Sequence, residues 1–205
     1  MNIRVIVGSL TAFAAALATQ GLAQQVASTS PASVKAGTYS VEPGHTQVTF
    51  SVSHFGFTEY SGVFSGASGS LRIDPASPAA AKLDVSMPVG TVQTTSAKLD
   101  GELKGDQWFD AAKFPTATFD STKVTSEGPG RATIAGNLTL HGVTRPVILQ
   151  AQFVGAGVNP LDKSETIGFS ATGTIRRSEF GVTKYVPLVG DEVKLSIAGA
   201  FTRAN

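Results

Sequence analysis

Hydrophobic and polar residues alternate along most of the chain, and the pattern is clearest in residues 45–54. Val48, Phe50 and Val52 alternate there with small polar residues. His54 ends the apolar series. A period of two places successive side chains on opposite faces of a β-strand. This segment therefore predicts a strand with one apolar face and one small, polar face.

The same alternation recurs in further segments before and after this one. Turn signals such as Pro43-Gly44 and Glu127–Gly130 separate several of them. Short strands at this spacing predict an antiparallel barrel or sandwich. A barrel of about eight strands encloses either packed side chains or one small ligand, and the alternation alone does not choose between them. The segments are residues 37–42, 64–74, 83–87, 117–119, 134–140, 147–153, 167–175 and 193–201.

The period changes between the segments at residues 83–87 and 117–119, which predicts one main helix over residues 97–104. Ser96 is a suitable N-cap, and Leu99 and Leu103 fall one helical turn apart. Two glycines weaken this helix in isolation, so we expect it to pack on the sheet. The predicted fold class is all-β with one main helix.

The N-terminus has the features of a secretory signal. Arg4 precedes an almost wholly apolar run over residues 5–18, and Gly21-Leu22-Ala23 supplies small residues for cleavage. The run is shorter than the ~20 residues that span a bilayer, which makes a membrane anchor the weaker interpretation. We expect residues 1–23 to be a signal peptide, residues 24–36 a flexible leader and residues 37–203 the barrel domain of a periplasmic protein with no stable membrane insertion.

Composition excludes several classes of function. The chain has 41% hydrophobic and only 15% charged residues, which is typical of a globular β domain rather than a disordered chain. A formal net charge of +1 gives no electrostatic argument for binding nucleic acid. The sequence contains no cysteine, so it has neither a disulfide nor a thiol nucleophile.

Four motifs together resemble the YceI-like family of bacterial secreted proteins, also called polyisoprenoid-binding proteins. They are His45–Gly56, Trp108–Phe119, Gly136–Val147 and Arg177–Val182, and they occur in the family's order. The run Leu-Thr-Leu-His-Gly-Val-Thr-Arg-Pro within the third motif is the most specific. Two positions depart from the family pattern: Glu102 stands where a histidine is frequent, and Trp108 stands in place of a phenylalanine.

The resemblance implies a lipocalin-like antiparallel β-barrel of about eight strands with a long apolar cavity. Relatives bind extended isoprenoid or fatty-amide lipids, and some are dimers, which leaves a homodimer open. We therefore expect binding, sequestration or transport of an isoprenoid, isoprenoid quinone or fatty amide, without catalysis and with no cofactor besides the bound lipid. The residues predicted to contact the ligand are Phe50, Val52, His54, Phe57, Ile134, Leu138, Leu140, Phe169, Leu195 and Arg177.

Two other classes of function stay open at this stage. An enzyme acting on a lipid or quinone would need titratable groups that converge on the pocket, for which His54, Glu102 and Arg177 are the candidates. A structural or adhesive domain would instead have a closed core filled by the inward phenylalanines. The three histidines, His45, His54 and His141, have no metal-ligand spacing, so we predict no metal site.

Overall fold

Ten antiparallel strands and one α-helix make up residues 26–203, the part of the chain that this computed structural model describes. The strands are β1 (Gly37–Val41), β2 (Gln47–His54), β3 (Thr58–Phe64), β4 (Ser68–Ile73), β5 (Lys82–Pro88), β6 (Thr116–Ser126), β7 (Arg131–Leu140), β8 (Val143–Val158), β9 (Glu165–Arg176) and β10 (Val189–Arg203). The helix is α1 (Ala97–Lys104), and short 3-10 turns are η1 (Pro31–Ser33), η2 (Pro43–His45), η3 (Pro78–Ala80), η4 (Val89–Thr91) and η5 (Arg177–Phe180).

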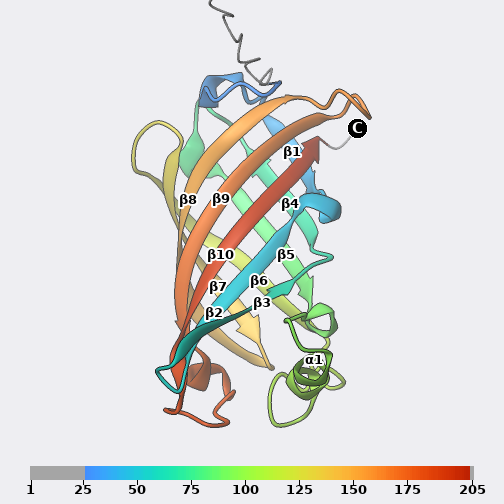
Figure 1. The fold of residues 1–205 in the computed structure, drawn as a ribbon. Helices are drawn as coiled ribbons and strands as arrows, with labels where there is room; N and C mark the ends of the chain where they lie inside the picture. Colours follow the sequence, from blue (N-terminus) through green and yellow to red (C-terminus); the bar gives the residue numbers. More distant parts are fainter. Residues whose placement is uncertain (1–25, 204–205) are drawn as a thin grey trace, which may run out of the picture.

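Eight of these strands close into a barrel in the order β1-β4-β5-β6-β7-β8-β9-β10, and β10 pairs back to β1 (Figure 1). The long strand β10 also carries the β2–β3 hairpin, because β1 pairs only with its last residues and β2 pairs with residues 189–198. The predicted all-β fold, a lipocalin-like antiparallel barrel of about eight strands with one main helix, is confirmed.

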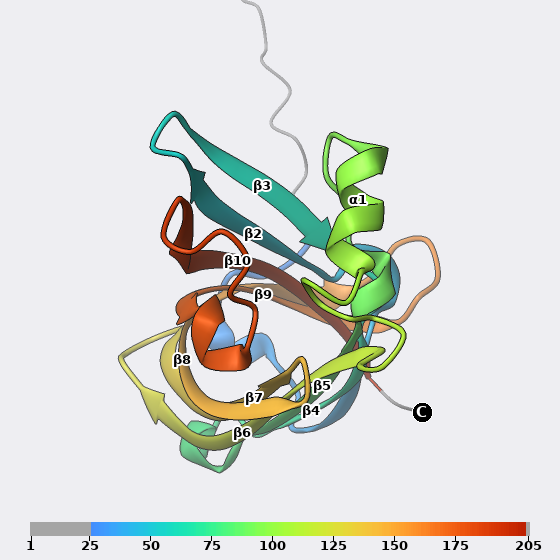
Figure 2. The same ribbon diagram turned by 90° about the horizontal axis from the view of Figure 1, so that it is seen from below.

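The two ends of the barrel differ in what covers them. The α1 end carries helix α1, the β2–β3 turn and the loop that contains η5 (Figures 1 and 2). The opposite end carries η1 and the β8–β9 loop (Figure 1). No helix within residues 26–203 is both long and apolar enough to cross a bilayer.

Helix α1 forms where the sequence predicts it. The Ser96 hydroxyl accepts a hydrogen bond from the Leu99 amide at 3.4 Å, as an N-cap does. Leu103 is buried beneath the helix. Figure 2 shows α1 beside β3, where Tyr60 Oη lies 3.1 Å from Thr95 Oγ1. The helix therefore covers the side of the barrel where β3 has no further strand to pair with.

The segment predicted as one strand over residues 64–74 is divided into the end of β3 and the whole of β4. Gly66 separates them with φ of 74°, a left-handed conformation that a continuous strand does not adopt. The chain turns a corner there and β4 pairs with β1 and β5 instead of β2.

Residues 26–36 pack on the barrel rather than forming the flexible leader that the sequence suggested. Ser28 and Ala156 of β8 exchange both backbone hydrogen bonds, at 2.8 and 2.9 Å. The Val34 side chain is buried, and Lys35 forms an ion pair with Glu165. These contacts are made with distant strands, so local sequence does not reveal them. The predicted signal peptide, residues 1–23, lies outside the described residues.

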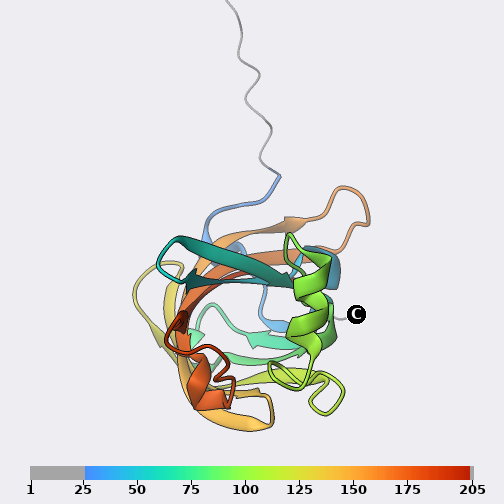
Figure 3. The same cartoon turned by 60° about the horizontal axis from the view of Figure 1, so that its bottom comes forward.

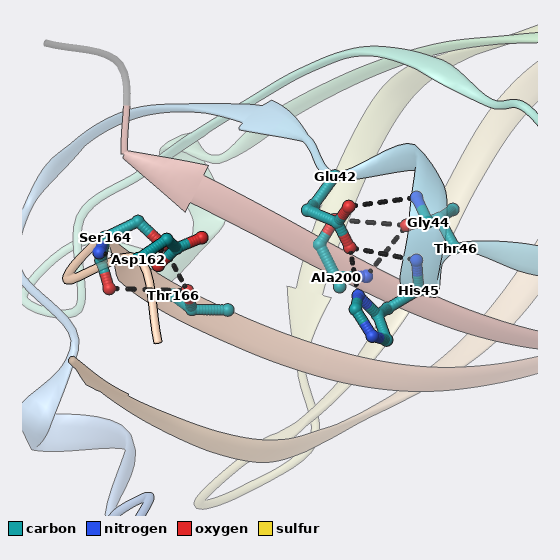
Figure 4. A network of polar contacts seen from close by, with 8 residues as sticks. All are labelled: Glu42, Gly44, His45, Thr46, Asp162, Ser164, Thr166 and Ala200. Atoms are coloured by element: carbon teal, nitrogen blue, oxygen red, sulfur yellow. Dashed lines mark hydrogen bonds and ion pairs between the residues drawn. The ribbon is translucent and has the colours of Figure 1, made fainter. Parts of the chain in front are cut away.

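The corner between β1 and β2 is held by a polar network (Figure 4). The Glu42 carboxylate accepts hydrogen bonds from the amides of Gly44 and His45, both at 2.9 Å, and from the His45 ring Nδ1 at 2.6 Å. Thr46 Oγ1 exchanges hydrogen bonds with the Ala200 backbone of β10, at 3.0 and 3.1 Å. Burial raises the pKa of the Glu42 carboxyl, but the three hydrogen bonds outweigh it and hold the pKa below the ordinary 4.5.

Large inward side chains lie flat against the barrel wall at inward-facing glycines. A methyl group on Gly136 would overlap the Phe119 ring and lie 2.8 Å from the Asp120 carbonyl oxygen. One on Gly173 would lie 2.7 Å from Leu149 Cδ2. Because these glycines have no side chain, the Phe119 and Leu149 side chains can pack directly against the backbone of the neighbouring strand. They therefore do not extend into the middle of the barrel.

The lowered pKa of Glu42 makes its contribution to stability depend on pH. Because the pKa is lower in the folded than in the unfolded protein, ionised Glu42 stabilises the fold above about pH 4.5, and this stabilisation disappears as pH falls through the folded-state pKa. We expect Glu42→Gln to lower the free energy of unfolding at pH 7 by roughly 1 kcal/mol or less. Urea denaturation should show a larger difference at pH 7 than at pH 3, because the carboxylate is progressively protonated as pH falls below 4.5; an equal deficit at both would contradict the role of the charge.

The packing at Gly136 predicts a loss of stability on adding one methyl group. We expect Gly136→Ala to cost about 1–3 kcal/mol, because the Phe119 ring and the Asp120 carbonyl cannot both move away. Gly101→Ala in α1 is the matched control: no atom lies within 4 Å of its added methyl group, so it should stabilise by up to about 1 kcal/mol. Thermal denaturation compares the two. A Gly136→Ala protein as stable as the parent would mean that the ring is not confined to the wall.

Candidate functional site

A cavity of about 1130 Å³ runs along the inside of the barrel. Every one of the ten strands contributes at least one lining residue. Ala32 and Pro129 line it at the opposite end, and His54 and Tyr185 line it at the α1 end. The cavity is therefore long and extends through the barrel, and its wall consists almost entirely of aliphatic and aromatic side chains.

Many inward-facing apolar side chains are only half-buried. Val48, Ile134 and Leu195 belong to the inward register of their strands and line the cavity, yet they keep accessible surface. In a closed core the same positions would be buried, because protein interiors pack at near-crystalline density. The accessible surface faces the cavity, so the interior is hollow, contrary to the closed core that the structural or adhesive alternative required.

The inward phenylalanines pack against one another and the wall without filling the barrel. The ring centroids of Phe153 and Phe169 are 5.6 Å apart, and those of Phe169 and Phe201 are 6.1 Å apart, both in edge-to-face contact. Phe50 is buried 5.6 Å from the Phe64 ring. All five line the cavity.

Nine of the ten residues predicted to contact a ligand line this one cavity. The apolar ones lie on β2, β7, β9 and β10, on the face of each strand that points into the barrel. Because a closed barrel has one interior, these faces share the same space. Their contact with a ligand remains a prediction. They are Phe50, Val52, His54, Ile134, Leu138, Leu140, Phe169, Leu195 and Arg177.

Phe57 is the exception, and its assignment to the pocket is corrected. Phe55 and Gly56 both have positive φ, 55° and 73°, and form the tight turn between β2 and β3. The alternation of faces is interrupted at this turn, so Phe57 lies at the tip of the hairpin with 87% of its surface exposed. It does not line the cavity.

Arg177 reaches the cavity wall, but its guanidinium group is occupied by the protein backbone. Its nitrogens donate to the carbonyl oxygens of Gly190, Val182 and Val189 at 2.8, 2.9 and 2.8 Å. Its Cζ lies 5.5 Å from the centre of the Trp108 ring. Burial lowers the pKa of Arg177, and nearby Asp191 partly offsets this. The side chain therefore ties η5 to the start of β10, with each of its three nitrogens donating to a backbone carbonyl.

The remaining polar lining residues lie toward the ends of the barrel. Tyr60, Glu102, Thr118 and Tyr185 lie with His54 toward the α1 end, and Thr46, Ser126 and Arg131 lie toward the opposite end. The middle of the cavity therefore offers hydrophobic contact and few hydrogen-bonding groups, which suits an uncharged chain.

The three histidines occupy separate settings. His45 belongs to the Glu42 corner, and His141 Nδ1 donates to the Phe180 carbonyl at 3.0 Å while its ring lies edge-on to Phe114. His54 contacts Phe55 and lines the cavity. Within residues 26–203, no three His, Cys, Asp or Glu side chains form a group that could hold a metal ion.

Several lining residues were not predicted from the sequence. Val48 and Ile197 share the inward registers of Phe50 and Leu195, so the alternation contained the signal that would have identified them. Trp108 and Tyr185 lie outside regular strands, where no periodicity marks them. They are brought to the cavity by the segment after α1 and by the loop that follows η5.

Comparison with known proteins places this barrel in a family. The YceI-like domain matches residues 39–201. A UPF0312 protein of Ectopseudomonas mendocina (strain ymp) is 36% identical over 154 residues, which cover 75% of this chain and 80% of the relative.

Two solved structures share the fold. The crystal structure of Burkholderia cenocepacia BcnA matches with a TM-score of 0.70 and 24% identity, covering 78% of this chain and 98% of BcnA. A polyisoprenoid binding domain from Saccharophagus degradans, implicated in plant cell wall breakdown, matches with a TM-score of 0.59 and 14% identity, covering 83% and 100%. Since the YceI-like domain spans nearly the whole described barrel, the chain belongs to the YceI-like family.

Proposed function

We propose that this protein binds one extended hydrophobic lipid inside the barrel and sequesters or carries it through the periplasm. The observation that carries the proposal is the hollow, apolar interior of about 1130 Å³. Pockets for drug-sized molecules span roughly 300–1,000 Å³, so this cavity has room for a larger ligand. Its length favours a chain over a compact molecule.

The energetics of transfer support a chain lipid. Each methylene group moved from water into an apolar site contributes about 0.8 kcal/mol, so a chain of about ten such groups gains on the order of 8 kcal/mol before ordering costs. The middle of the cavity has few polar groups to recognise a sugar, nucleotide or peptide. Specificity would then come from length, branching and the end group of the lipid.

Isoprenoids, isoprenoid quinones and fatty amides are the ligand classes we propose. The name of the Saccharophagus degradans domain, which has the same fold, supports the first of these. The predicted signal peptide in residues 1–23 supports a periplasmic location. We propose binding without turnover, with the lining side chains acting through hydrophobic contact.

A substitution in the middle of the cavity should distinguish ligand space from core. Leu138 lines the cavity from β7 and is only half-buried. We expect Leu138→Trp to abolish lipid uptake while changing the stability of the lipid-free protein by less than about 1 kcal/mol, since the indole enters empty space. Overpacking a filled core would cost about 1–3 kcal/mol. Uptake of a fluorescent isoprenoid and thermal denaturation measure the two effects.

The matched control for this substitution is Ile148→Trp. Ile148 lies on the outer face of β8 with 58% of its surface exposed, and it does not line the cavity. This variant should take up lipid as the parent does. A large fall in melting temperature for Leu138→Trp, with uptake retained, would contradict the proposed site.

Lipid should also accompany the protein through a gentle purification. We expect native mass spectrometry to show a mass increment that disappears after extraction with organic solvent. We expect Leu138→Trp to lack this increment. A parent protein that is ligand-free and takes up neither isoprenoid nor fatty amide would overturn the proposed function.

A further inference from the structure

Four large hydrophobic side chains are exposed together at the α1 end. They come from two loops, the β2–β3 turn and the loop between η5 and β10. Their exposed fractions are 44% for Phe55, 87% for Phe57, 55% for Tyr185 and 61% for Leu188. We call these four residues the mouth patch.

The two loops form one surface because they are joined. The Phe55 amide donates to the Leu188 carbonyl at 2.9 Å, and His54 pairs with Val189 in the β2–β10 ladder. Figures 2 and 3 show both loops projecting from the same end of the barrel. The patch is therefore held by backbone hydrogen bonds.

The mouth patch is continuous with the wall of the cavity. Phe55 and Tyr185 belong both to the patch and to the cavity lining. The exposed hydrophobic side chains toward the opposite end lack this continuity: Val154, Val158 and Leu161 do not line the cavity. Of the two sets of exposed hydrophobic side chains, only the one at the α1 end adjoins the cavity. A lipid that leaves the cavity at this end would therefore contact apolar surface.

Two of the patch aromatics are held in an unfavourable backbone conformation. Phe55 has φ of 55° and Tyr185 has φ of 62°. Phe55 lies in the three-residue connection between His54 and Thr58, and a positive φ there favours Asn, Asp or Gly over a bulky aromatic residue. The protein thus bears both a backbone cost and the exposure of apolar rings to water. Such local strain is concentrated at functional sites.

The charge of the two loops favours an amphipathic partner. Residues 53–58 and 181–189 contain no Asp or Glu, one lysine, Lys184, and one histidine, His54. Lys184 Nζ lies 5.1 Å from the centre of the Tyr185 ring and 6.0 Å from that of Trp108. Aromatic rings beside a lysine are the combination found where proteins contact the interface of a bilayer.

We propose that the mouth patch docks on the surface of a lipid bilayer and that lipid passes between bilayer and cavity at this contact. The inference rests on the proposed function for the identity of the cargo. Docking buries Phe57 and Leu188 among the acyl chains and places the cavity mouth against the reservoir of hydrophobic lipid. It is peripheral and reversible, because only loop tips enter the interface.

Sedimentation with sucrose-loaded vesicles tests docking. The protein is purified after export by the cell, and the vesicles contain phosphatidylcholine and phosphatidylglycerol at 3:1. We expect the parent to sediment with vesicles, and the double variant Phe57→Ser/Leu188→Ser to partition at least about tenfold more weakly. Leu161→Ser is the matched control, since Leu161 is 90% exposed in the β8–β9 loop, and it should sediment like the parent.

A second measurement separates docking from lipid binding. Farnesol, an isoprenoid alcohol, is supplied either dispersed in buffer or within the same vesicles. Neither substituted residue lines the cavity, so the double variant should bind dispersed farnesol within about twofold of the parent and should load from vesicles at least about tenfold more slowly.

Each proposal can fail separately. A parent that does not sediment, or a double variant that sediments like the parent, overturns docking even where dispersed farnesol binds. Equal loss in Leu161→Ser also overturns it. If the parent is a dimer by light scattering and the double variant is a monomer with unchanged vesicle binding, the patch is a contact between copies of the chain and docking is wrong. Sedimentation without uptake of any chain lipid overturns the proposed function instead.

Discussion

The closed ring of backbone hydrogen bonds is the interaction on which the rest of this structure depends. An open sheet must cover its edges and bury one face in a core, whereas closure of eight strands into a ring removes most of the edge. Among the strands of residues 26–203, only β3 keeps an unpaired side, and α1 lies beside it (Figure 2). Strand β10 completes the ring, because it pairs with β9 on one side and with β1 and then β2 on the other. With the wall held this way, the side chains inside are free to line a space instead of filling it.

Keeping that space open also requires a place for the bulky side chains. Phe119 and Leu149 lie against glycines on neighbouring strands, so their volume is taken up by the wall. At the α1 end, Arg177 binds three backbone carbonyls of the loop and of β10, and it holds the mouth together where strand pairing ends. Stability comes from the wall and from packing near the two ends, in a chain without cysteine.

The sequence allows the register of the barrel to be predicted because a period of two is a local property. Phe50 and Leu138 could be placed on the inner face before any strand partner was known, and the cap at Ser96 located the helix. Long-range effects could not be predicted in this way. Phe57 follows a turn that interrupts the alternation of inward and outward side chains. Arg177 donates to backbone carbonyls 5 to 13 residues away in the sequence. The hollow interior depends on the sum of many side-chain volumes.

A hollow apolar interior has a thermodynamic consequence for the lipid-free protein. Water that entered about 1130 Å³ of such space would find few polar partners, and an ordered water needs two to four of them. The half-buried residues Val48, Ile134 and Leu195 therefore keep apolar surface whose burial would still lower the free energy. A chain ligand buries this surface when it binds. Any ligand that binds only the folded state adds RT ln(1 + [L]/Kd) to the free energy of unfolding. Folding supplies the wall and the ligand completes the core, so occupancy and stability are linked in this barrel.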